Sequence, residues 1–121
     1  MEIKHNGKDI ELSFGFKFMN DVDKKLGMEM EQMSIGQGIQ MLIPNLQDGN
    51  PVAIGHTIIA ATSHNKKAPK SDEEISAVLD EIADEQGFDE FAEQVITELG
   101  KRPMTRNLVP EEYREVKKAK K

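Results

Sequence analysis

The chain has 121 residues, of which 16 are Lys or Arg and 22 are Asp or Glu, and it contains no Cys and no Trp. This length leaves room for one domain, and the absence of cysteine excludes disulfides, zinc fingers and thiol nucleophiles. No uncharged stretch reaches the roughly 18 apolar residues of a membrane span, and no secretory signal is visible, so we expect a cytoplasmic protein with no membrane contact.

The first twelve residues predict a β-hairpin. Asn6-Gly7 is the preferred pair for a two-residue type I′ turn, because both central positions need a positive φ. Folding at this turn places Ile3 opposite Ile10, and it places Met1 opposite Leu12 on the same face. An isolated hairpin is marginally stable in water, so we expect this apolar face to pack on the rest of the domain.

Two helices are predicted next, near residues 15–26 and 35–47. Apolar residues follow helical spacing in both segments, namely Phe18, Met19, Val22 and Leu26 in the first and Ile35, Ile39, Leu42, Ile43 and Leu46 in the second. Gly27 is well placed to follow the first helix, and Ser34 can cap the second. Pro44 removes a backbone donor, so we expect the second helix to be kinked or broken there.

A third helix is predicted over residues 51–64. Asn50 can act as its N-cap, and Pro51 stands at the first helical position, where its missing N–H costs nothing. The helix is nearly uncharged on every side, which indicates a buried central helix. A polar linker then leads to the next helix.

The last two helices are predicted near residues 72–86 and 88–99, and both are acidic. Ser71 and Glu74 have the spacing of a capping box, and Gly100 is expected to end the last helix. Residues 72–99 hold 11 acidic side chains and no basic one. We therefore expect an acidic surface on these helices.

The predicted fold is mainly α. It is a single helical domain of about five helices over residues 1–100, with an N-terminal β-hairpin. Residues 101–121 carry 8 basic and 3 acidic side chains, whereas residues 1–100 carry 8 basic and 19 acidic. We expect this basic end to be a flexible, disordered tail, although residues 111–118 could form a short helix.

Catalytic, metal and cofactor sites are not indicated. The three histidines show no ligand spacing, and no Cys accompanies them. We expect His5 beside the hairpin turn and His64 in the linker to be exposed, and His56 to be a satisfied core or edge side chain. Asp80 and Asp84 have the i, i+4 spacing of a solvated helix face. The sequence therefore predicts a protein that is not an enzyme and holds no cofactor.

Partner binding is the function that the residues favour. Met28, Met30 and Met33 alternate with charged and polar residues, and flexible thioethers suit a surface that repacks around partners. The same methionines could instead fill a gap between the hairpin and the helices. The candidate partner-binding residues are Met28, Met30, Met33, Asp80, Asp84, Glu90 and Glu93.

Two questions remain open at the level of residues. The acidic body would repel nucleic acid, but the basic tail could attract it, so the alternative function is a nucleic-acid-associated regulator acting through residues 101–121. A homo-oligomer is also open, because the apolar helix from Pro51 could bury part of its surface only in a multimer.

The order of these signals is specific when taken together. It runs through the hairpin of residues 1–12, the Phe-rich start at 14–18, the segment 38–44, the turn at 48–51 and the cap at 71–75. This series, over roughly residues 1–100, resembles the tail assembly chaperones of long-tailed phages and prophages of Gram-positive bacteria.

The resemblance implies a non-enzymatic chaperone of phage tail assembly. Such a protein binds the tape-measure protein, keeps it soluble and helps to recruit tail-tube subunits, and it stays in the bacterial cytoplasm rather than in the mature virion. The family often makes a second, longer product by ribosomal frameshifting. The lysines of residues 117–121 are compatible with an A-rich slippery stretch, since Lys codons are AAA or AAG.

Overall fold

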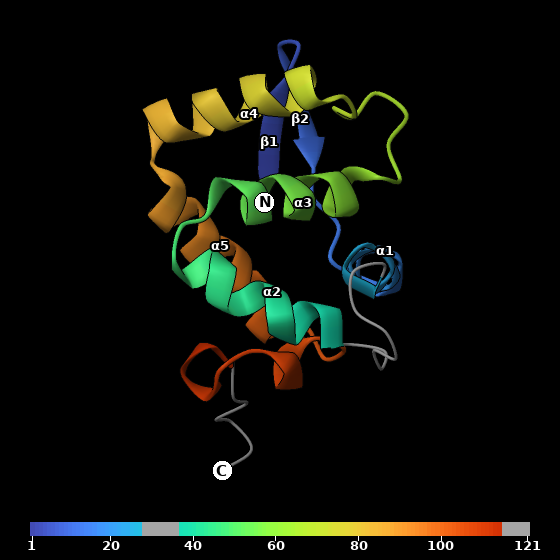
Figure 1. Cartoon of the computed structure of the whole chain (residues 1–121), viewed down its shortest axis with the longest axis vertical. Helices are drawn as coiled ribbons and strands as arrows, with labels where there is room; N and C mark the ends of the chain where they lie inside the picture. Colours follow the sequence, from blue (N-terminus) through green and yellow to red (C-terminus); the bar gives the residue numbers. More distant parts are fainter. Residues whose placement is uncertain (28–36, 115–121) are drawn as a thin grey trace.

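The computed structural model describes residues 1–27 and 37–114, and it begins with an antiparallel hairpin of β1 (Glu2–His5) and β2 (Lys8–Glu11) (Figure 1). Asn6 and Gly7 form the turn with φ angles of 55° and 75°, as a type I′ turn requires. The predicted register is confirmed, because Ile3 pairs with Ile10. Both side chains are buried in the core.

The described residues contain five α-helices, which confirms the predicted mainly α fold. They are α1 (Phe16–Gly27), α2 (Gln37–Gln47), α3 (Pro51–Thr62), α4 (Asp72–Glu85) and α5 (Phe88–Lys101). Figure 1 shows α4 beside the hairpin at one end of the molecule, α3 crossing the middle, and α2 and α5 crossing at the other end. The predicted start of the second helix and its cap, Ser34, lie outside the described residues.

Helix α3 is the central element, as its lack of charge predicted. It contacts α1, α2, α4 and α5, and most of its residues are buried. The Asn50 side chain caps it by accepting the backbone N–H of Val52 at 2.8 Å. The buried hydroxyls of Thr57 and Thr62 each donate to the carbonyl four residues earlier, so neither is left unsatisfied.

The predicted break at Pro44 is absent, because α2 runs from Gln37 to Gln47 with Pro44 inside it, and a kink at Pro44 stays a prediction. The missing donor removes one helical hydrogen bond near the C-terminal end, where few remain to be lost. Ile39 and Leu46 are fully buried on either side of the proline, and this packing holds the helix together. The turn that follows is closed by Gly49, whose N–H donates to the Leu46 carbonyl at 2.9 Å.

Helices α4 and α5 form an acidic pair. The predicted capping box is present, with the Ser71 hydroxyl accepting the Glu74 N–H at 3.1 Å and the Glu74 carboxylate accepting the Ser71 N–H at 3.2 Å. The prediction that Gly100 ends the last helix is wrong, because α5 continues to Lys101 and Gly100 is buried inside it. A side chain at Gly100 would collide with the backbone of Tyr113. The absence of a side chain at Gly100 therefore allows α5 and the segment around Tyr113 to approach closely.

Residues 102–114, here called the C-terminal segment, lie against α5 and α2 through two 3-10 turns, η1 (Arg106–Leu108) and η2 (Glu111–Tyr113). Val109 is 2% exposed and belongs to the hydrophobic core. Tyr113 is partly buried and packs against this core. This part of the expected disordered tail therefore has a defined place in the fold, because its apolar side chains find an apolar surface. Residues 115–121 lie outside the described residues.

Candidate partner-binding surfaces

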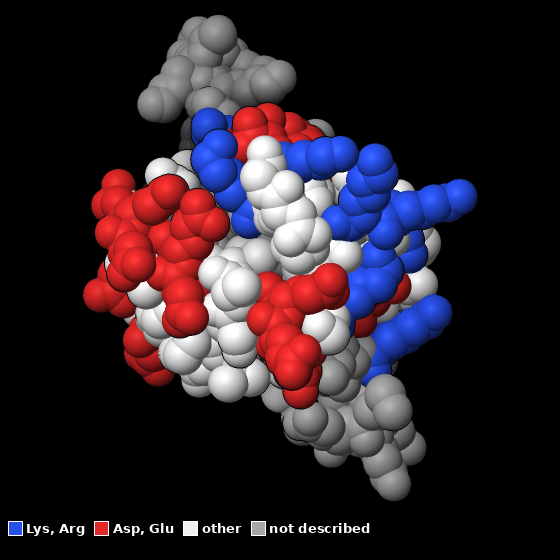
Figure 2. Space-filling model, turned by 90° about the horizontal axis from the view of Figure 1, so that it is seen from above, with Lys and Arg blue, Asp and Glu red and all other residues white. Residues whose placement is uncertain are grey.

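The predicted acidic residues lie on the outer faces of α4 and α5. Asp80 and Asp84 are exposed on α4, and Glu90 and Glu93 are exposed on α5. Figure 2, which looks down on α4, shows a large cluster of Asp and Glu side chains on one side of the molecule and most Lys and Arg side chains on the other, with smaller groups of Asp and Glu between them. We call Asp80, Asp84, Glu90 and Glu93 the acidic surface.

Within the acidic surface, Glu93 also has a structural contact. Its Oε1 accepts a hydrogen bond from the Tyr113 hydroxyl at 3.1 Å. Burial raises the pKa of Tyr113, and the hydrogen bond and negative charge of Glu93 raise it further. Asp80, Asp84 and Glu90 make no ion pair within the described residues, so their charges face solvent or a partner.

The methionine candidates Met28, Met30 and Met33 lie outside the described residues. The two interpretations, that these methionines contact a partner or that they fill a gap between elements, therefore stay predictions. They belong to the connection between α1 and α2.

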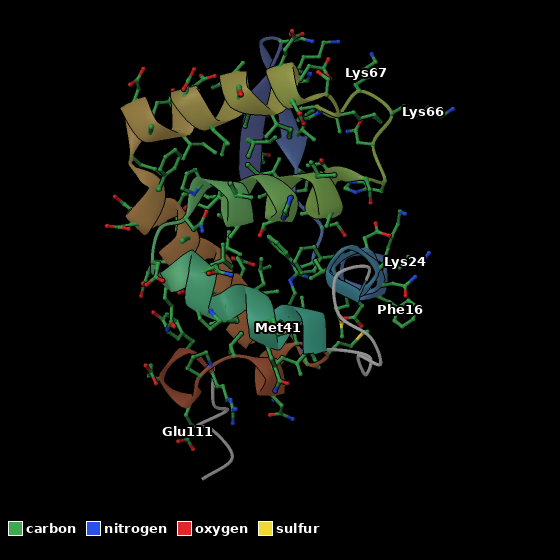
Figure 3. The ribbon with its side chains drawn as sticks, in the orientation of Figure 1. Phe16, Lys24, Met41, Lys66, Lys67 and Glu111 are labelled. Atoms are coloured by element: carbon green, nitrogen blue, oxygen red, sulfur yellow. The ribbon has the colours of Figure 1, made fainter. Side chains whose placement is uncertain are left out.

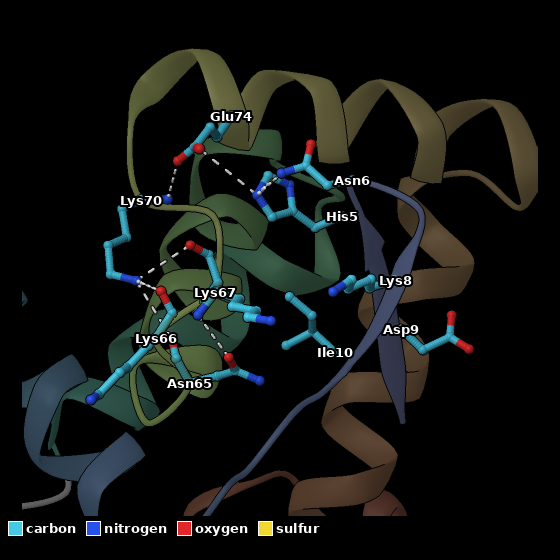
Figure 4. Close-up of a pocket in the computed structure, with 11 residues that line it drawn as sticks. His5, Asn6, Lys8, Asp9, Ile10, Asn65, Lys66, Lys67, Lys70 and Glu74 are labelled. Carbon is cyan, nitrogen blue, oxygen red and sulfur yellow. Dashed lines mark hydrogen bonds and ion pairs between the residues drawn. The ribbon is translucent and has the colours of Figure 1, made fainter.

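A polar cavity of about 590 Å³ lies between the hairpin turn and the loop before α4 (Figure 4). In Figure 4 the side chains of Lys8 and Lys67 point toward Ile10 from opposite sides. Lys70 closes the loop internally, because its Nζ donates to the backbone carbonyls of Asn65, Lys66 and Ala68 at 3.5, 3.2 and 3.3 Å.

The expectation that His5 is exposed is wrong. His5 is 8% exposed because strand alternation places it on the same face as Ile3, and its Nε2 lies 3.8 Å from Glu74 Oε2. Two backbone N–H groups, from Lys70 and Ser71, lower the pKa of Glu74, and the nearby His5 lowers it further. These contacts tie the hairpin, the loop and α4 together, so we assign this region a structural role.

A second cavity, of about 180 Å³, is mainly apolar and lies between α1, α2 and α3. Its apolar wall consists of Val22, Leu42, Ile59 and Ala60, and the half-buried His56 also lines it. Asp21 stands at the edge, where it accepts a hydrogen bond from the Ser63 hydroxyl at 2.8 Å and pairs with Lys17 at 3.4 Å.

The sequence analysis missed that α2 and α3 also present an exposed face. Met41 and Ile59 are each 39% exposed, and Val52 is 62% exposed. Neither helix contains a charged residue. The uncharged composition was interpreted as burial alone, but the helical spacing of Val52 and Ile59 could have indicated one outward stripe.

Two of the basic residues of the C-terminal segment, Arg102 and Arg114, contact the protein itself. Arg114 Nε donates to the Val109 carbonyl at 3.0 Å, and Arg102 lies 3.8 Å from a carboxylate oxygen of Glu98 and over the ring of Phe14. Four lysines of the basic tail fall within residues 115–121, outside the described residues, and the nucleic-acid alternative stays a prediction.

Other kinds of site were sought in the described residues. No group of three or more His, Asp or Glu side chains there is arranged to hold a metal ion. None of the helices in residues 1–27 and 37–114 is long and apolar enough to span a bilayer.

Comparison with known protein families identifies a family for the chain. The family model for phage tail assembly chaperone proteins matches residues 2–112, which is most of the chain and includes the C-terminal segment almost to its end. Neither the curated proteins nor the solved structures include a match. The family match covers far more than half of the sequence, and the chain therefore belongs to the phage tail assembly chaperone family.

Proposed function

We propose that this chaperone binds the tape-measure protein, keeps it soluble and helps to recruit tail-tube subunits, without a catalytic step. The family match over residues 2–112 carries the proposal, because it assigns a chaperone role in tail assembly. A Gram-positive host, a place in the bacterial cytoplasm and absence from the mature virion are parts of the same proposal.

The proposed contact surface combines the methionines at positions 28, 30 and 33 with the acidic surface. A tape-measure chain that exposes apolar helical faces would aggregate unless a partner covered them. Thioether side chains can cover such faces because they adapt to different shapes. The carboxylates of Asp80, Asp84 and Glu90 point away from the core, so they would keep the complex dispersed by charge repulsion.

Co-expression with the tape-measure protein encoded nearby tests the function. We expect the long protein to become soluble and to co-elute with the chaperone. Insolubility of the tape-measure protein in the presence of the folded chaperone would contradict the proposal.

Charge-neutralising variants test the surface. Asp80→Asn with Asp84→Asn should lower the soluble yield of the tape-measure protein. A matched pair, Glu2→Gln with Asp48→Asn, removes the same charge at exposed positions outside α4 and α5 and should leave that yield unchanged. Equal effects of the two pairs would show that only net charge matters.

We also propose that the gene makes a longer product by ribosomal frameshifting at the codons for residues 117–121, which include four lysines. Expression of the natural gene with its downstream DNA and an N-terminal tag should give a second, larger tagged band. A single band would count against frameshifting.

A further inference from the structure

The polar cavity between the hairpin turn and the loop before α4 gathers lysines from two separate parts of the chain. Lys8 comes from β2, and Lys66, Lys67 and Lys70 come from the loop. Residues 1–100 carry only 8 basic side chains against 19 acidic ones, so half of these basic side chains line one cavity. Like charges repel when the fold brings them together, and a negatively charged partner relieves that repulsion.

Some of the charges at this cavity are already satisfied within the chain. The Lys70 ammonium group donates to three carbonyls of its own loop. Asp9 Oδ1 lies 3.1 Å from Lys4 Nζ. The Glu74 carboxylate accepts the backbone N–H groups of Lys70 and Ser71 at 2.8 and 3.2 Å. These contacts hold the frame of the cavity together.

The ammonium groups of Lys8, Lys66 and Lys67 have no such role. All three side chains are exposed, and none forms an ion pair with a described residue. Figure 4 shows Lys8 and Lys67 pointing toward Ile10 from opposite sides, whereas Asp9 points away from it. Figure 3 shows Lys66 reaching outward from the loop. Two positive charges therefore converge on one apolar side chain without an ion-pair partner in the described part of the chain.

Hydrogen bonds fix the backbone that carries these lysines. Lys8 pairs with His5 in the hairpin. In the loop, the Lys67 N–H donates to Asn65 Oδ1 at 2.8 Å, and the neighbouring Ala68 is buried. A binding site whose backbone is already in place loses less conformational freedom when a ligand arrives. The two lysines are thus held in position to receive one negative group between them.

We propose that this cavity binds an acidic segment of a partner protein, with one carboxylate between Lys8 and Lys67 and a neighbouring carboxylate on Lys66. Hydrogen bonds from ammonium groups to carboxylates are charge-assisted and stronger than neutral ones. Most Lys and Arg side chains lie on the side of the molecule away from the large cluster of Asp and Glu side chains (Figure 2). The acidic partner segment therefore approaches the side of the protein that repels it least.

A polypeptide suits this cavity better than nucleic acid does. None of the described residues that line it is Phe, Tyr or Trp, on which bases could stack. Asp9 and Glu74 also line the cavity and would repel the closely spaced phosphates of a nucleic acid. The carboxylates of a polypeptide can be spaced so that they meet the lysines and avoid these two acidic side chains.

Titration with a peptide of about ten glutamates at low salt, followed by calorimetry, tests the proposal. We expect saturable binding, and Lys8→Gln with Lys67→Gln should raise the dissociation constant about tenfold, because both ammonium groups that hold one carboxylate are removed. Lys8→Arg with Lys67→Arg keeps the two charges and should keep most of the affinity.

Lys17→Gln with Lys24→Gln is the matched control. This pair removes the same charge at exposed positions of α1, and neither residue lines the cavity. Figure 3 shows Lys24 pointing away from the rest of the protein. The dissociation constant of the glutamate peptide should change less than about twofold in the control pair, since only the long-range attraction is reduced.

Three outcomes would overturn the proposal. The first is a wild type that does not bind the glutamate peptide, and the second is equal weakening by the cavity pair and the control pair. The third is a single-stranded oligodeoxynucleotide of similar charge that binds more tightly than the peptide and loses affinity in the cavity pair, which would assign the lysines to nucleic acid. Co-expression of the wild type with the tape-measure protein tests the proposed function separately, and its result does not depend on any of these outcomes.

Discussion

The hydroxyl of Thr105 donates a hydrogen bond of 2.6 Å to the carbonyl oxygen of Leu99. In a continuing helix this carbonyl would accept the backbone N–H four residues later, but that residue is Pro103, which has none. Thr105 therefore replaces the missing donor at the end of α5. Its side chain is fully buried, and the contact fixes the point at which the C-terminal segment folds back onto the core.

Replacing Thr105 by Val should destabilise the fold. Valine keeps the shape of threonine but removes the hydroxyl, so the buried Leu99 carbonyl loses its partner. The expected cost is about 1–2 kcal/mol in the free energy of unfolding, measured by urea denaturation. Thr105→Ser retains the donor and provides the control for the hydroxyl, and a Val variant as stable as the wild type would show that the bond contributes nothing.

Gly100→Ala should displace the C-terminal segment from α5. Alanine normally stabilises a helix interior relative to glycine by up to about 1 kcal/mol, but here its Cβ would collide with the Tyr113 backbone. Backbone cannot turn aside as a side chain can, so the segment must move. Gly15→Ala is the control, because a Cβ at Gly15 has no neighbour within 4 Å.

Tyr113 reports this displacement directly, since the chain has one Tyr and no Trp. Burial and Glu93 raise the pKa of the folded Tyr113. Release of the segment should lower the pKa toward the ordinary tyrosine value of about 10, as followed by ultraviolet absorbance. A titration of Gly100→Ala identical to that of the wild type would contradict the proposed displacement.

Local signals allowed most of the elements to be predicted. Asn6-Gly7 specifies its turn through two positive φ angles, and the Ser71–Glu74 capping box acts over three residues. The stripe of each helix is likewise set by spacing within about two turns. Such features need no knowledge of distant parts of the chain.

Most of the wrong predictions concern places where segments that are distant in the sequence meet. The role of Gly100 depends on Tyr113, which lies thirteen positions later in the chain. No local sequence pattern distinguishes a glycine that allows such a contact from a glycine that ends a helix. The continuity of α2 through Pro44 likewise depends on packing. The burial of His5 is different, because alternation from Ile3 predicts it once the hairpin register is known.

The same limit applies to the candidate surfaces. Acidic residues at i, i+4 spacing could be placed on an exposed face from sequence alone, and the structure exposes Asp80 and Asp84. The apolar cavity could not be predicted, since it joins Val22, Leu42 and Ile59 from three separate helices.

The three methionines at positions 28, 30 and 33 give a test of partner binding. Replacing them together by Ser should weaken binding of the tape-measure protein, because the adaptable apolar contacts are removed. The melting temperature should change little if the side chains serve the partner. A large fall in the melting temperature would instead identify them as part of the core.

Glu74 should make the stability of the fold depend on pH. Hydrogen bonds from the Lys70 and Ser71 N–H groups, followed by the proximity of His5, hold the pKa of Glu74 below its ordinary value. A depressed pKa in the folded state stabilises the fold above the unfolded pKa, and this contribution is lost as the pH falls through the folded pKa. The wild type should therefore melt at a higher temperature than Glu74→Gln at pH 7, and the difference should shrink as the pH falls below about 4.

The neighbouring Glu73 supplies the control for this dependence. It is exposed on the same turn of α4, and the described residues give it no hydrogen bond or ion pair to the hairpin or the loop. At pH 7, Glu73→Gln should therefore lower the melting temperature by less than Glu74→Gln does, because it removes a carboxylate from the same turn without breaking the cap. If the Glu74→Gln offset stayed constant between pH 7 and pH 3, the carboxylate charge would have no part in holding the hairpin, the loop and α4 together, and the neutral oxygen acceptor of Gln would suffice for the cap.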